Sequence, residues 1–275
     1  MQIREYSLPA GWYPRDPKEA ASFLKPFSDK SGSAKAAICP HAGWYYSGKI
    51  AARGVSSLEK DCDTIAVIGG HLPASSSVLF AMEDAVRTPF GNFFIDSELR
   101  AELFKKLNGA QDKYRDNTVE VLLPMVHHFF PDKKLLWLRL PASLDSFEAG
   151  KKIYEAAQEL GKKINVIGST DLTHYGANYG FSPRGKGSAA LKWVKEVNDA
   201  GFIKAVEEGN PSLALKRAES DFSSCSAGAV LGAMGYASSC GNGGAKLLEY
   251  GTSADIDNAG EIPDSFVGYA AFSFG

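Results

Sequence analysis

The chain has 275 residues, a formal net charge of -2 and only four cysteines. With 44% hydrophobic and 23% charged residues, it has the composition of a globular protein that can bury a large core without disulfides. The small net charge and the lack of dense Lys or Arg runs exclude nucleic acid and anionic membrane surfaces as expected partners.

The start of the chain has no signal-peptide pattern, and no apolar run approaches the ~20 residues of a membrane span. Sparse cysteines without a C-x-x-C pair are typical of reduced thiols. We therefore expect a cytoplasmic protein.

Short apolar runs closed by Gly or Pro predict buried strands, because continuous rather than alternating apolar residues suit strands covered on both faces. Apolar residues spaced three and four apart between them predict helices. In chain order we expect a helix over Pro17–Phe27, strands over Ala36–Cys39 and Thr64–Ile68, a helix over Asp96–Leu107, a strand over Leu135–Leu140, a helix over Ser146–Leu160, a strand over Ile164–Ile167, a helix over Ser188–Glu208, and two strands joined by a polar loop within Leu247–Phe274.

This alternation predicts an α/β fold with a sheet sandwiched by helices. No internal repeat or low-complexity linker divides the sequence, so we expect one domain over residues 1–275. The segment Gly180–Gly187 approaches a phosphate-binding loop. It has Gly187 where that motif needs Ser or Thr to hold magnesium, so no nucleotide site is predicted.

Three of the five histidines fall just beyond the ends of predicted strands. His41 follows the first strand after one proline, His71 the second after two glycines, and His174 the fourth across a polar loop that contains Asp171. Ligands of open α/β sheets bind at the carboxyl ends of the strands. The two glycines before His71 favour a functional role, because glycine lets a backbone approach a ligand closely.

Two imidazoles and one anionic ligand can hold iron, copper or zinc and leave positions open for substrate. Cys225 is the leading anionic candidate, because its flanking serines can cap a small-residue helix running to about Tyr236. A cysteine at a helix N-terminus tends to be thiolate, the form that binds metals. Glu120 and Asp171 are the carboxylate alternatives.

Each candidate also has a structural interpretation. His41 fits a turn, and Asp171 fits a turn cap. Glu120 lies three residues after Asn117, which is capping-box spacing. Cys225 alone would suit a buried apolar position.

Segments along nearly the whole chain resemble one known family. They are Gly11–Pro14, Pro40–Gly48, Gly69–His71, Val119–Val121 with Pro124, Ser169–His174, Cys225, Leu248–Ser253 and Val267–Ala270. Together they resemble the Memo-like protein family, which is related in fold to the class III extradiol dioxygenases. The stretch Pro-His-Ala-Gly-Trp-Tyr-Tyr-Ser-Gly is the most specific of them.

The resemblance implies a three-layer α/β/α sandwich around a central, mostly parallel or mixed sheet. It also implies that the metal ligands are His41, His71 and Cys225, and that Asp171 and His174 belong to the pocket.

The chain departs from the family pattern at two positions. It has Asn117 where the family usually has histidine, and Ser226 where the family commonly has glycine. Members of the family are described both as redox-active metal proteins and as phosphopeptide-binding adaptors.

We predict a mononuclear metal enzyme, using Fe(II) or alternatively copper, that carries out redox chemistry on a small molecule. His174, oriented by Asp171, would act as general acid or base, because imidazole titrates near neutral pH. Glu120 is a further catalytic candidate, and Tyr45 and Tyr46 are expected to line the substrate pocket.

The alternative is a non-catalytic protein that holds a phosphorylated or anionic peptide or ligand in the same cleft. The absence of clustered arginines argues against it. A weaker alternative is a zinc-dependent hydrolase, in which three protein ligands would activate a water molecule.

Overall fold

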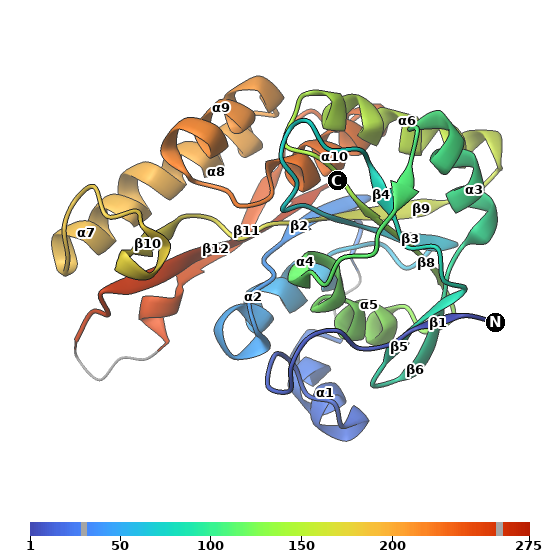
Figure 1. Cartoon of the computed structure of the whole chain (residues 1–275), viewed down its shortest axis with the longest axis horizontal. Coiled ribbons are helices and arrows are strands. Elements are labelled where there is room, and N and C mark those ends of the chain that lie inside the picture. Colours follow the sequence, from blue (N-terminus) through green and yellow to red (C-terminus); the bar gives the residue numbers. More distant parts are fainter. Residues whose placement is uncertain (29–31, 257–260) are drawn as a thin grey trace.

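Helices cover both faces of one large mixed sheet, which confirms the predicted α/β/α layers (Figure 1). The structure, a computed structural model, describes residues 1–28, 32–256 and 261–275. The strands are β1 (Ile3–Arg4), β2 (Ala36–Cys39), β3 (Thr64–Gly69), β4 (Leu79–Phe80), β5 (Ala85–Thr88), β6 (Gly91–Phe94), β7 (Ala110–Gln111), β8 (Lys134–Arg139), β9 (Ile164–Ser169), β10 (His174–Gly176), β11 (Lys246–Thr252) and β12 (Ser265–Phe274). The α-helices are α1 (Pro17–Leu24), α2 (Trp44–Ser56), α3 (Ser97–Lys106), α4 (Asn117–Glu120), α5 (Leu123–Phe129), α6 (Asp145–Glu159), α7 (Ser188–Trp193), α8 (Ala200–Glu207), α9 (Pro211–Asp221) and α10 (Ala227–Ser239).

Four parallel strands form the centre of the large sheet. Its order is β10-β12-β2-β9-β3-β8-β4-β7, with β11 paired to β12. β2, β9, β3 and β8 run parallel, whereas β12 is antiparallel to β2. Because the carboxyl ends of parallel strands lie at one edge, the loops after β2, β9 and β3 come out side by side.

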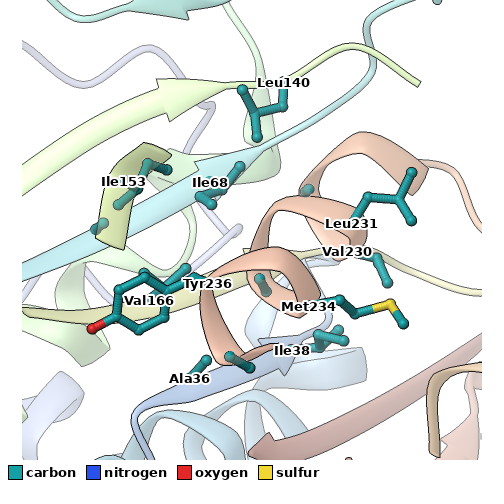
Figure 2. Packing of buried hydrophobic residues seen from close by; sticks show 14 of the residues in the cluster. Ala36, Ile38, Ile68, Leu140, Ile153, Val166, Val230, Leu231, Met234 and Tyr236 are labelled. Atoms are coloured by element: carbon teal, nitrogen blue, oxygen red, sulfur yellow. The ribbon is translucent and has the colours of Figure 1, made fainter. Parts of the chain in front are cut away.

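Each central strand buries side chains on both faces. In β2, Ala36 and Ile38 belong to the apolar cluster that includes α6 and α10, and Ala37 and Cys39 to the cluster that includes α2 and α5. Figure 2 shows the first cluster, with Ile38 and Met234 of α10 among its members. Full burial of a side chain such as Ile38 contributes about 2 kcal/mol to folding. Because helices cover both faces of the sheet, the sequences of its central strands are continuously apolar.

Two predicted helices differ in detail from the observed ones. α1 ends at Leu24 and a 3₁₀ turn follows, because Pro26 has no N–H to continue the α-helical hydrogen bonds. The helix predicted over Ser188–Glu208 contains a π-helical turn, Val194–Asp199, between α7 and α8.

The two strands predicted in the tail are present as β11 and β12, paired antiparallel. Residues 257–260 of the polar loop expected between them lie outside the described residues. No helix in the described part of the chain combines the length and apolarity needed to cross a membrane.

Candidate metal centre

His41, Asp171 and His71 lie on loops after three neighbouring strands of the sheet. β9 lies between β2 and β3, so the loop with Asp171 lies between the loops with the two histidines. His41 and Asp171 are buried, whereas His71 is exposed. The parallel order of the strands therefore brings together residues that are far apart in the sequence.

Cys225 joins the two histidines to form one potential ligand set. Its Sγ lies 3.2 Å from Nε2 of His41, and the candidate donor atoms of His41, His71 and Cys225 all lie within 4.8 Å of one another. The two imidazole rings are nearly perpendicular, with centroids 4.9 Å apart. Metal bonds of about 2.0 to 2.3 Å place neighbouring ligand atoms roughly 3 to 4 Å apart. The three donors are thus close to the separation that a single ion requires.

The backbone and ring of His41 are fixed by its neighbours. Its backbone N–H donates to Asp171 Oδ1 at 2.7 Å, and the Asn117 side-chain amide donates to its carbonyl oxygen at 3.0 Å. Its Nδ1 lies 2.9 Å from Ser169 Oγ. Because Nδ1 is engaged in this way, Nε2 is the nitrogen available to a metal.

The ring of His71 is held by a carboxylate that the sequence analysis did not single out. Nδ1 of His71 donates to Asp116 Oδ2 at 3.0 Å, and Asp116 in turn lies 3.2 Å from Nη2 of Arg139. Burial alone would lower the pKa of His71, but the hydrogen bond to Asp116 and the nearby Cys225 raise it to about 10. His71 also has a φ of 55°, a left-handed conformation that is uncommon for a non-glycine residue and often marks a functional site.

Asp116, rather than Asn117, is the N-cap of α4, and its carboxylate accepts from the Thr118 N–H. The capping box expected between Asn117 and Glu120 is therefore wrong. Asn117 is the first residue of α4, and its side chain binds the His41 backbone instead.

Cys225 lies two residues before the first residue of α10, and this N-terminal end of the helix lies near His71. Ser226 is the N-cap but makes no side-chain capping bond, so the expected serine cap is wrong. A Cβ on Gly70 would lie 2.4 Å from the Cβ of Ser226. Gly70 thus allows the N-terminal end of α10, with Cys225, to approach the end of β3 closely, whereas the sequence suggested approach of a ligand.

Cys225 differs from the other three cysteines in its acidity. Burial raises the pKa of Cys39, Cys62 and Cys240 above that of an ordinary thiol. Burial would raise the pKa of Cys225 as well, but its contacts with His41 and His71 lower it well below the ordinary value. Cys225 is therefore the thiolate of the chain.

Asp171 lies between His41 and His174. Its Oδ2 is 3.9 Å from Nε2 of each histidine. Burial would raise the pKa of Asp171, but the two imidazoles lower it below its usual value. Burial would lower the pKa of His174, but Asp171 and Cys225 raise it above its usual value. The His174 ring stacks on Tyr179, with centroids 5.0 Å apart.

A cavity of about 780 Å³ opens above these groups. Its lining includes His41, His71, Asp171, His174, Asn117, Tyr46, and residues from both ends of the chain such as Trp12 and Tyr269. Of the two tyrosines expected there, Tyr46 lines the cavity, whereas Tyr45 is not among its lining residues and is 65% exposed.

Glu120 lies outside this cavity. Its carboxylate accepts hydrogen bonds from the Ser7 backbone and hydroxyl, the Leu8 N–H and the Tyr13 hydroxyl. These bonds attach the N-terminal segment to α4. The position indicates a structural role for Glu120 and gives its predicted catalytic role no support.

Fold and site define an α/β protein with a candidate centre of two histidines and one cysteine. A family model described as Memo-like protein matches residues 4–273, and the chain belongs to this family.

Curated relatives support the assignment. A MEMO1 family protein from Pyrococcus abyssi is 30% identical over 266 residues, covering 90% of each chain. Another from Thermococcus onnurineus is 29% identical over 293 residues, covering 99% of each. A solved structure, that of an uncharacterized protein from Escherichia coli K12, is similar with a TM-score of 0.46 and 13% identity, covering 88% of this chain and 100% of the other.

Proposed function

We propose that the chain binds one redox-active transition metal, Fe(II) or alternatively copper, through His41, His71 and Cys225, and acts on a small molecule in the adjoining cavity. The observation that carries this proposal is the convergence of three donor atoms within 4.8 Å of one another. Two imidazoles and a thiolate suit iron, copper and zinc. When bound, such a metal would supply electron transfer or polarisation of a coordinated group.

The residues around the ligands have separate tasks in this proposal. Asp116 and Ser169 engage Nδ1 of the two imidazoles and leave Nε2 toward the centre. His174 is the proton donor, because its raised pKa favours the protonated imidazole. Its side chain is 33% exposed, so it can exchange protons with the cavity. Asp171 orients His174 and stabilises its charge.

The charge of the cavity argues against the alternative of an anion-binding adaptor. None of the described residues that line the cavity is Lys or Arg, although phosphate recognition generally uses such groups. The carboxylate of Asp171, held ionised by the two imidazoles, also offsets part of the positive charge that those imidazoles carry when protonated. We therefore favour an uncharged small molecule as the substrate.

Metal analysis tests the proposal directly. We expect protein purified without oxygen, or reconstituted, to hold about one metal ion per chain, and His41→Ala and His71→Ala to lose it while keeping a wild-type circular dichroism spectrum. His127→Ala is a matched control, because His127 contacts Thr88 and Phe93 away from the centre. Wild-type protein that binds no iron, copper or zinc above background would refute the site. Zinc alone, without redox activity in air, would favour the hydrolase.

A further inference from the structure

A second cavity, of about 230 Å³, adjoins the metal centre on the side of Cys225. It is lined by Leu172, His174, Tyr179, Phe181, Phe222, Ser224 and Cys225. His174 and Tyr179 line both cavities, so their stacked rings form a wall between the two. The ligand set is divided in the same way: His41 and His71 line the large cavity, and Cys225 lines the small one.

The small cavity is largely apolar. Leu172, Phe181 and Phe222 supply its apolar lining, and none of its described lining residues is Lys, Arg, Asp or Glu. The Ser224 hydroxyl is already hydrogen-bonded to Thr170 Oγ1 at 2.8 Å. Its ionisable groups, His174 and Cys225, belong to the metal centre, and the apolar wall opposite them favours an apolar guest over ordered water.

Phe222 is unusual at this position. It ends α9 in a left-handed conformation with φ of 52°, which costs a side-chain-bearing residue about 1 to 2 kcal/mol and which glycine would adopt without strain. Its ring is 62% exposed and lies 5.2 Å from that of Phe181. A strained, exposed aromatic residue in the wall of a cavity indicates a function for that wall.

We propose that the small cavity binds a small apolar molecule, dioxygen, and brings it to the metal centre separately from the organic substrate. The choice of dioxygen rests on the proposed redox function, whereas the apolar site itself does not. The large cavity already offers room and polar groups for a substrate. A small uncharged gas needs neither a large space nor polar groups, and apolar walls favour its binding.

Xenon is a probe of similar character, and its position can be seen in crystals. In metal-free protein under xenon pressure, we expect a xenon peak between Leu172 and Phe222. Phe222→Gly removes the wall and relieves the backbone strain, so we expect it to lose most of this occupancy. Asn108→Gly is the matched control: Asn108 also has a left-handed φ, of 48°, but lines neither cavity, so xenon should remain.

Dissolved dioxygen gives the second measurement. In metal-free protein we expect it to broaden the methyl NMR signals of Leu172 more in wild type than in Phe222→Gly. A small cavity that holds water and takes up neither xenon nor dioxygen would overturn the inference, even if metal binds. Binding of benzene there in preference to both gases would also overturn it and indicate an apolar arm of the substrate. If xenon enters the small cavity but the metal analysis finds that the wild type cannot bind iron, copper or zinc, the proposed function is refuted and the apolar site stands.

Discussion

Replacing Asp116 with asparagine tests whether the carboxylate beside His71 supports metal binding. Asparagine is as good an N-cap as aspartate, so the substitution keeps the cap of α4. It removes the negative charge that now faces both Nδ1 of His71 and the Arg139 guanidinium. The imidazole loses its carboxylate support, and Arg139 loses one of its two ion pairs but keeps the one with Asp112.

The expected effect follows from this geometry. Carboxylates that hold a metal-binding histidine by its second nitrogen typically contribute 10- to 100-fold in metal affinity, or about 1.4 to 2.8 kcal/mol. We expect a loss within this range for Asp116→Asn, because His71 donates a 3.0 Å hydrogen bond to Asp116.

Competition with a chelator of known affinity measures the dissociation constant. The assay belongs at one fixed pH for both proteins, because protons compete with the metal for imidazole. Asp16→Asn is the matched control, because Asp16 also caps a helix, α1, by accepting from the Lys18 and Glu19 N–H groups. An Asp116→Asn protein that binds metal as tightly as Asp16→Asn would refute the role given to Asp116.

Three further predictions concern protonation. Cys225 has a lowered pKa, whereas the other three cysteines have raised ones. Mass mapping should therefore find that Cys225 is alkylated first in metal-free protein and is protected when metal is bound. Faster alkylation of another cysteine would contradict this. Asp171→Asn should lower the pKa of His174 in an NMR titration, and an unchanged pKa would remove Asp171 as its orienting group. Burial raises the pKa of Asp199 to about 6 from 3.8, so its contribution to stability is present below about pH 4 and lost as pH rises through 6. Relative to Asp199→Asn, the wild type should therefore lose about 3 kcal/mol of unfolding free energy over this range; parallel urea-denaturation profiles would refute this.

The central strands and the two histidines of the candidate metal centre were predictable because their signals are local. Each apolar run closes at a glycine or proline, and the histidine follows within a few residues. Once β2 and β3 are parallel strands of one sheet with only β9 between them, the positions of His41 and His71 follow without knowledge of any side-chain contact. Cys225 needed both its serine-rich context and the family resemblance, since no short spacing connects it to either histidine.

Asp116 was missed because its contacts are long-range. It lies 45 residues from His71 in the sequence, and the loop after β3 has to meet the N-terminus of α4 before the two can touch. Because the helix cap was placed at Asn117, one residue too late, Asp116 was recognised neither as the N-cap of α4 nor as the partner of His71. An acidic residue directly before a short helix was the available signal.

The walls of the large cavity could not be predicted for a similar reason. Trp12 comes from the N-terminal segment and Tyr269 from β12, and both line the cavity with Tyr46 of α2. The antiparallel pairing of β12 with β2 places Tyr269, and the Trp44 N–H, which donates to the Trp12 carbonyl oxygen, places Trp12. No pattern within a single segment encodes either contact.

Asn117 shows how a departure from the family pattern changes the chemistry open to this chain. Asn117 still supplies a polar group here, because its amide lines the cavity and donates to the His41 carbonyl oxygen. What is lost relative to histidine is a group that titrates near neutral pH. Among the described lining residues that are not metal-ligand candidates, this leaves Asp171, His174 and tyrosines such as Tyr179, whose pKa is raised by burial. Because Asp171 is held ionised and burial favours the protonated form of Tyr179, the proposed function assigns proton transfer to His174.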